Sequence, residues 1–129
     1  VIETLPGMFP LSCNKRMNEL FAANAKIAYP DAEIKDAGHF SASTDMGDVS
    51  HLMPVIHPFI GGTDGLLHTP DFHMVDFNAA VLLPAKAFAM MLIDLLYDDA
   101  KEAKAILADF KPILTKEEYI AKLESYFNK

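Results

Sequence analysis

The feature that most constrains the fold is a broad apolar stripe in the second half of the chain. Its members recur at the three- and four-residue spacing of one helix face. A proline inside the stripe, Pro84, is tolerated in a helix only near its first turn, so the regular helix is expected to begin at Leu82 or Leu83. The stripe comprises Phe77, Val81, Leu82, Ala85, Ala89, Leu92, Ile93 and Leu96.

Three further helices are predicted along the chain. The segment 14–28 is amphipathic, with Asn24 as its one polar member on the apolar face, and Tyr29-Pro30-Asp31 ends it. A helix from Asp99 or Ala100 to Asp109 follows the long apolar one. The last helix has the clearest start signal, because Thr115 and Glu118 have the spacing of a capping box.

Short strands are predicted in the first half. Residues 1–12 read as extended chain, 32–37 as a short strand, and 55–60 as a buried strand that Pro58 weakens. Gly61-Gly62-Thr63-Asp64-Gly65 is a turn-rich loop. Short strands followed by three helices indicate an α/β fold within one domain, 1–129. Such a small open sheet needs further chain to cover one face and both edges.

Charge and cysteine content exclude several classes of partner. A net charge of −7 with scattered Lys and Arg argues against nucleic acid and against anionic membranes. The apolar stretch from Ala79 to Leu96 is interrupted by Pro84, Lys86 and Asp94, so we expect no membrane span. The single cysteine, Cys13, fits a reducing compartment, and no secretory signal is visible, which together predict a cytoplasmic protein.

The chemistry of the chain is concentrated in its middle segment. All five histidines fall between His39 and His73, and six aspartates lie within or close to this stretch, between Asp36 and Asp76. Imidazole and carboxylate are the side chains that bind divalent metals and move protons. No Ser-His-Asp triad, phosphate-binding glycine loop or cysteine-based zinc site is present.

His68 is the first candidate within this segment. It follows the glycine-rich loop and precedes Thr69-Pro70-Asp71, a position that can hold a metal ligand in place. Its position alone favours a surface or half-buried histidine with one hydrogen bond over a metal ligand. His39, His51 and His57 are each weak candidates, and His73 can share a metal with His68 only if the chain bends at Pro70.

Two pairs of residues offer supporting roles. Asp45 can accept backbone N–H groups and fix the loop around a site, whereas Asp48 is expected to cap a single helical turn that ends before Pro54. Gly61 and Gly62 can bring backbone N–H groups close to a ligand carboxylate or oxyanion, although a simple turn explains them equally well.

A resemblance to a known family rests on this same segment. The helix that follows the segment ends in Ile93-Asp94-Leu95-Leu96. The segment itself contains the run Ser43–Ser50, the steps Met53-Pro54, His57-Pro58 and Gly61-Gly62, and the run His68–Phe72. In these elements the chain resembles the C-terminal part of the two-metal aminoacylase and carboxypeptidase family, with its closest similarity to the aminobenzoyl-glutamate hydrolase and amidohydrolase branch.

The resemblance implies a fold and a chemistry. The fold would be the C-terminal portion of a zinc-peptidase-like α/β/α catalytic domain. His68 would be a terminal ligand to one of two divalent metal ions, zinc or alternatively manganese or cobalt. Gly61 and Gly62 would lie at the substrate and Asp45 would support the site. The metals would activate a water for attack on an N-acyl, dipeptide or aminobenzoyl-glutamate-like amide.

The chain departs from the family in what it lacks. It has no His-x-Asp step, and its Glu117-Glu118 pair follows His68 instead of preceding it. The resemblance therefore implies a segment of a split catalytic domain that is inactive alone and binds zinc weakly at best. Its expected partners are the N-terminal half of the same enzyme and a small amide substrate, and exposed apolar surface favours a homo-oligomer. The alternative is a non-enzymatic protein-interaction module.

Overall fold

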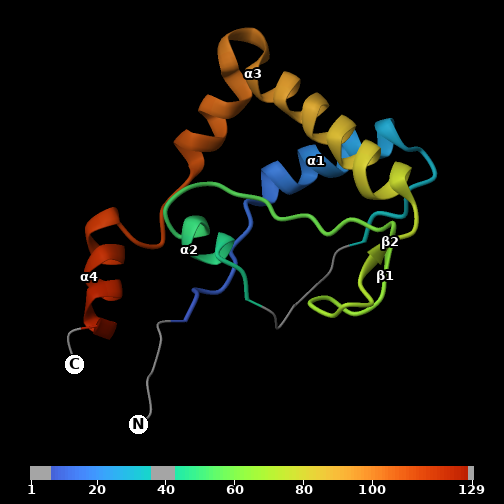
Figure 1. The fold of residues 1–129 in the computed structure, drawn as a ribbon. Coiled ribbons are helices and arrows are strands. Elements are labelled where there is room, and N and C mark those ends of the chain that lie inside the picture. The colour runs from blue at the N-terminus through green and yellow to red at the C-terminus, as the bar shows by residue number, and fades with distance from the viewer. Residues whose placement is uncertain (1–6, 36–42, 128–129) are drawn as a thin grey trace.

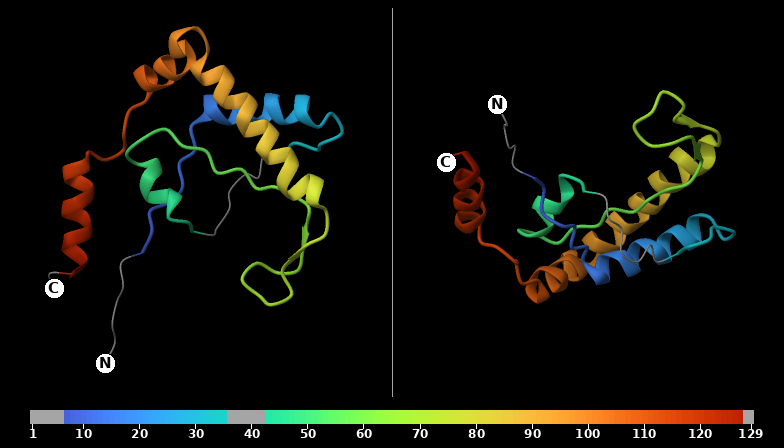
Figure 2. Two further views of the ribbon diagram at one scale, coloured as in Figure 1. Left: turned by 45° about the horizontal axis from the view of Figure 1, so that its top comes forward. Right: turned by 90° about the horizontal axis from the view of Figure 1, so that it is seen from below.

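The computed structural model describes residues 7–35 and 43–127, and these residues are mainly helical. Two helices, α1 (Lys15–Ala28) and α3 (Leu83–Asp109), run side by side, and α4 (Lys116–Phe127) lies apart from them at one end (Figures 1 and 2). The short helix α2 (Met46–Ser50) and a π-helical turn, η1 (Asn78–Leu82), complete the helical elements. Strands β1 (Thr63–Asp64) and β2 (His73–Met74) pair antiparallel as a ribbon near the start of α3.

The core lies between α1 and α3. Phe21 and Ala25 of α1 are buried against Ala87 and Met91 of α3. The rings of Phe21 and Phe88 add a tilted contact at 4.8 Å between centroids. The extended segment after α2 passes along this pair, where Ile56 and Ile60 pack against the same cluster. The predicted apolar face of α1 therefore does pack on α3. The side of α3 that it meets, marked by Ala87 and Met91, is not the stripe that the sequence predicted, whose members are all exposed.

The helix starts follow from capping chemistry. The side-chain oxygen of Asn14 accepts the Met17 N–H at 3.0 Å and begins α1. Pro84 lies in the first turn of α3, after the wider turn of η1, where its missing N–H and its bulky ring are tolerated. Thr115 and Glu118 form the predicted capping box, with reciprocal hydrogen bonds of 2.7 and 3.1 Å. The placement of Pro84 and the capping box were predicted and are confirmed, whereas the cap at Asn14 was not predicted.

The long helix α3 contains a sharp break. Tyr97 leaves the helical region, and Asp98, Asp99 and Ala100 all have a positive φ, between 51° and 56°. The break separates the predicted apolar helix from the predicted helix that ends at Asp109. It redirects the second half of α3 so that Glu102 reaches Arg16 near the start of α1.

One sequence prediction about local structure is wrong. Residues 55–60 form no strand: Val55 is buried, but no described segment pairs with these residues, and Pro58 removes a donor. The helical stretch Asn78–Asp109 has the length and apolar composition that a membrane span needs, with a mean hydropathy of 1.9 in its best window, and the expected absence of a span stays a prediction. Residues 32–35 show no regular structure.

The larger fold stays a prediction. Apart from the helices, the described residues contribute two strands of two residues each, both exposed. The zinc-peptidase-like α/β/α domain and the division 1–129 as one segment of it were expected from the resemblance alone.

Candidate functional site

His68 lies in the exposed loop of the β1–β2 ribbon. Its backbone has a positive φ of 64°, and the following residue, Thr69, closes the turn by donating from its N–H and hydroxyl to the carbonyl of Leu66. A non-glycine residue in this conformation costs about 1 kcal/mol or more and persists where its surroundings hold it. The loop therefore holds the backbone of His68 in a fixed conformation and leaves its side chain accessible.

His73 is the second accessible imidazole of this ribbon. Its Nδ1 lies 2.6 Å from the carbonyl oxygen of Asp71. Because a carbonyl only accepts, Nδ1 is the donor of this hydrogen bond. The bond holds the His73 ring against the turn that precedes it.

The described residues do not by themselves make a metal centre. Within 7–35 and 43–127, no three His, Cys, Asp or Glu side chains come together in a group that could hold an ion. A catalytic zinc takes three protein ligands. This donor set does not fit the two-metal centre implied by the resemblance, and no catalytic step can be derived through it from this chain.

Asp45 lies at the start of α2 and is exposed. Its carboxylate accepts a hydrogen bond from the Thr44 hydroxyl at 3.1 Å, and it does not cap the helix with its side chain. Its predicted role in supporting the site stays a prediction.

Asp48 does not do what the sequence suggested. It lies inside α2 instead of capping it, and its Oδ1 accepts the N–H of Phe9 at 3.1 Å, 39 residues away in sequence. The prediction of a cap was wrong because the helix begins two residues earlier, at Met46. Asp48 thus attaches the N-terminal segment to α2.

Two further residues of α2 also hold the N-terminal segment in place. Ser50 is buried and accepts the Ser12 N–H at 3.0 Å while donating to the carbonyl of Gly47. Gly47 is in such close contact with the chain that an added Cβ would lie 1.9 Å from the Phe9 carbonyl oxygen. In this chain, the residues of the run Ser43–Ser50 that contact the N-terminal segment therefore have a structural role.

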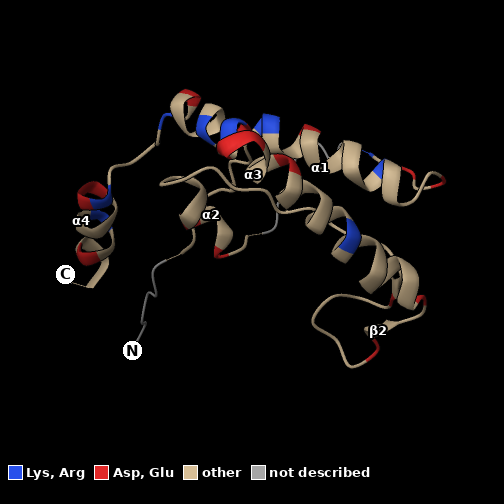
Figure 3. Ribbon diagram, turned by 90° about the horizontal axis from the view of Figure 1, so that it is seen from above, with Lys and Arg blue, Asp and Glu red and all other residues tan. Residues whose placement is uncertain are grey.

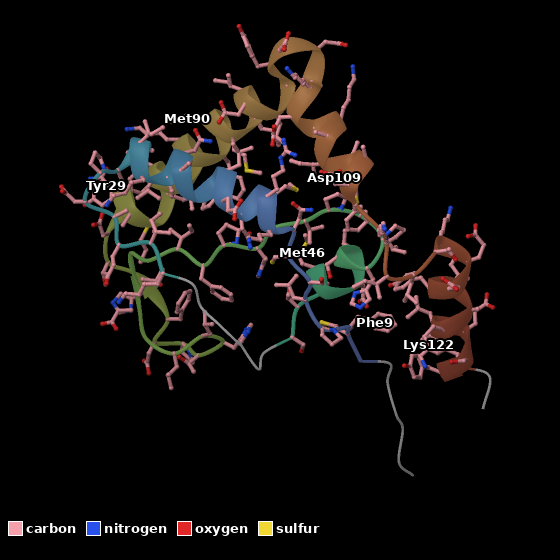
Figure 4. All side chains as sticks on the ribbon, turned by 180° about the vertical axis from the view of Figure 1, so that it is seen from behind. Phe9, Tyr29, Met46, Met90, Asp109 and Lys122 are labelled. Atoms are coloured by element: carbon pink, nitrogen blue, oxygen red, sulfur yellow. The ribbon has the colours of Figure 1, made fainter. Side chains whose placement is uncertain are left out.

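His51 belongs to this structural group. Its buried ring donates from Nδ1 to the Gly47 carbonyl at 2.9 Å and packs on Phe9. Phe9 also contacts Tyr119 and so lies between α2 and α4 (Figure 4). The carbonyl of His51 accepts the N–H groups of Ile113 and Leu114 just before α4.

The two remaining histidines give less information. His57 is half-buried, packs edge-on against Phe59 and has an Nδ1 atom that is buried without a hydrogen-bond partner in the described part of the chain. His39 lies outside the described residues.

The two glycines of the Gly61-Gly62 step differ from each other. Gly61 has open space where a side chain would be, whereas a Cβ on Gly62 would come within 2.6 Å of the Ala80 nitrogen. Gly62 has a φ of 92°, and its carbonyl accepts the N–H groups of Val75 and Asp76. Gly62 thus joins the ribbon to the start of the helix, and the predicted contact of both glycines with substrate stays a prediction.

Two polar contacts between α1 and α3 were missed by sequence reasoning. The Arg16 guanidinium donates to both carboxylate oxygens of Glu102 at 2.5 and 2.7 Å, and this bonding lowers the pKa of the Glu102 carboxyl. Asn24 donates to Asp94 at 2.7 Å. The sequence did contain a signal for the Asn24–Asp94 pair, because each residue is a polar interruption in an apolar stretch. It contained none for the Arg16–Glu102 pair.

Two depressions of the described surface lie away from the histidines. One of about 330 Å³ is lined by residues around the Arg16–Glu102 pair, and one of about 240 Å³ lies between Tyr29 and Lys86. No histidine lines either of these two depressions.

The chain is similar to Xaa-Arg dipeptidases. It is 36% identical over 85 residues to the Xaa-Arg dipeptidase of Mus musculus and 33% identical over 89 residues to that of Homo sapiens. These matches cover 62% and 65% of this chain, which spans about 20% of the length of each relative. No family profile and no solved structure matches the chain. The similarity supports the resemblance to peptidases and amidohydrolases, and does not favour the aminobenzoyl-glutamate branch.

Proposed function

We propose that this chain is a C-terminal segment of the catalytic domain of a metal-dependent dipeptidase-type amidohydrolase. The observation that carries the proposal is the similarity to two Xaa-Arg dipeptidases over 85 and 89 residues. The accessible loop with His68 is consistent with a segment that supplies one ligand to a centre completed elsewhere. The substrate would be a dipeptide or a related small amide.

The roles of individual residues follow from this proposal. His68 would bind one of two divalent ions, with zinc the first candidate and manganese or cobalt the alternatives. Asp45 would support the loop, and the Gly61-Gly62 step would lie near the substrate. The N-terminal part of the same enzyme would supply the other ligands and the general base, in the cytoplasm. The isolated chain is expected to be inactive, because one imidazole is too few for a catalytic zinc.

A chimera tests the proposal directly. The whole chain replaces the region that it matches in the mouse Xaa-Arg dipeptidase, and hydrolysis of an Xaa-Arg dipeptide is measured with and without added zinc. We expect the chimera to be active and the 129-residue chain alone to be inactive. We expect His68→Ala to reduce kcat/KM of the chimera by at least about 100-fold, as for the loss of a metal ligand.

His73→Ala is the matched control, since it removes a second exposed imidazole of the same ribbon. It should leave kcat/KM within a few-fold of the parent chimera. A folded chimera without activity, or an active chimera unaffected by His68→Ala, would refute the proposal, as would robust amidase activity of the 129-residue chain alone.

A non-enzymatic interaction module remains the second candidate, favoured by the many exposed apolar side chains. It predicts a stable monomer whose surface binds another protein without any contribution to hydrolysis in the chimera.

A further inference from the structure

The side of α3 opposite its contact with α1 is mainly apolar. Ala87 and Met91 are 0% and 3% exposed and mark the inner side, which packs on α1. Six apolar residues on the opposite side are all exposed, and the exposed charged residues of the same stretch are Lys86 and Asp94. We call this surface the outer face; it comprises Val81, Ala85, Ala89, Leu92, Ile93 and Leu96.

The exposure of the outer face is large. Leu92, Ile93 and Leu96 are 56%, 64% and 65% exposed. Figure 3 shows that this half of α3 carries little charge, whereas the half after the break carries several acidic and basic residues. Large exposed apolar patches on a protein surface usually mark a site where another surface docks. The outer face of α3 has the character of such a site.

We propose that polypeptide outside these 129 residues buries the outer face of α3 in the intact protein. This inference rests on the proposed function and defines where the missing part of the enzyme docks. The dipeptidases that the chain matches are about five times the length of the matched segment, so about four-fifths of such a protein is available to cover the face. The docking element must itself present an uncharged apolar surface, because the outer face offers no charge to pair with.

The inner side of the helix argues against a membrane as the occupant. Asp94 accepts a hydrogen bond from Asn24 at 2.7 Å, and α1 covers Ala87 and Met91. The chain also leaves the helical path at Tyr97–Ala100. These features suit a helix packed between two protein layers, one of which is α1.

Cysteine accessibility tests the inference without relying on activity. Leu92→Cys is placed in a Cys13→Ser background, both in the isolated chain and in the chimera with the mouse dipeptidase. Alkylation of the peptide that carries residue 92 is followed by mass spectrometry. The isolated chain is studied at a concentration where sedimentation shows a monomer. We expect alkylation at least 10-fold slower in the chimera than in the isolated chain.

Lys101→Cys, on the charged half of α3, is the matched control and should react at similar rates in both proteins. Equal reactivity of Leu92→Cys in the folded chimera and in the isolated chain would overturn the inference. So would protection that appears only with phosphatidylcholine vesicles, or only when the isolated chain self-associates. An Ile93→Cys variant repeats the measurement if Leu92→Cys lowers helix content by circular dichroism.

The outcomes separate this inference from the proposed function. A protected residue 92 in an inactive chimera leaves the docking surface standing and removes the proposed function. An active chimera in which residue 92 stays reactive supports the proposed function and removes the docking surface.

Discussion

At the scale of single residues, the segment that carries the family resemblance divides into two parts with different roles. Gly47, Asp48 and Ser50 attach the N-terminal segment to α2 through one close backbone contact and two hydrogen bonds. His68 and His73 lie in an exposed ribbon and are free of the core. The first part therefore governs stability, and the second is the part available for chemistry.

Gly47→Ala should destabilise the protein. The added Cβ would lie 1.9 Å from the Phe9 carbonyl oxygen, so the N-terminal segment must move away from α2. We expect a loss of about 1–3 kcal/mol, typical of overpacking at a tight contact, measured as the free energy of urea unfolding. Gly61→Ala is the control, because nothing lies within 4 Å of its added Cβ, and it should change stability by less than about 0.5 kcal/mol. Equal effects of the two substitutions would contradict the close contact.

At the scale of elements, α3 is the unit that organises the molecule. Its first half supplies the core against α1, and the break at Tyr97–Ala100 turns its second half toward the start of α1. Three consecutive non-glycine residues with positive φ make this break a local source of strain.

Ala100→Gly should stabilise the protein by about 0.5–1 kcal/mol, because glycine adopts a φ of 56° without a steric cost. Ala103→Gly is the matched control, since Ala103 is also half-buried but lies in regular helix, where the same change costs about 1 kcal/mol. Chemical denaturation should show a higher free energy of unfolding for Ala100→Gly and a lower one for Ala103→Gly. A loss of stability in Ala100→Gly would show that the break is absent in solution.

At the scale of the whole molecule, contacts distant in sequence hold the helices in their arrangement. The Arg16–Glu102 pair joins α1 to the second half of α3 across 86 residues, and Asp109 adds a weaker contact to the same guanidinium at 3.7 Å. Both partners are substantially exposed, so the pair orients the helices more than it stabilises them.

The Glu102 carboxyl gives this arrangement a pH dependence. Its folded-state pKa is lowered below 4.5 by hydrogen bonding to Arg16, so its contribution to stability is present above pH 4.5 and is lost as the pH falls through the lowered value. We expect Glu102→Gln to lose less stability than the wild type across this acidic range in urea unfolding at several pH values. Glu124→Gln, in α4, should follow the wild-type profile, and identical profiles for all three proteins would argue against the pair.

The sequence determined the local structure of this protein wherever the signal was local. Capping at Thr115, the placement of Pro84 in a first turn and the apolar periodicity of α1 all act within a few residues, and all were predicted. The side of α3 that packs on α1 was not, because apolar residues occur on more than one side of that helix. The exposed position of His68 agrees with its sequence context in a polar loop, and its role as a metal ligand stays a prediction.

Only the tertiary structure decided which distant segments meet. Asp48 was predicted as a cap and instead binds the backbone of Phe9, because the docked N-terminal segment brings an unpaired N–H to that carboxylate. The segment 55–60 was predicted as a strand, but a strand requires a neighbouring edge, and the described chain places none beside it. Hydrogen-bond partners far apart in sequence leave no periodic signal, so residue patterns alone could not reveal them.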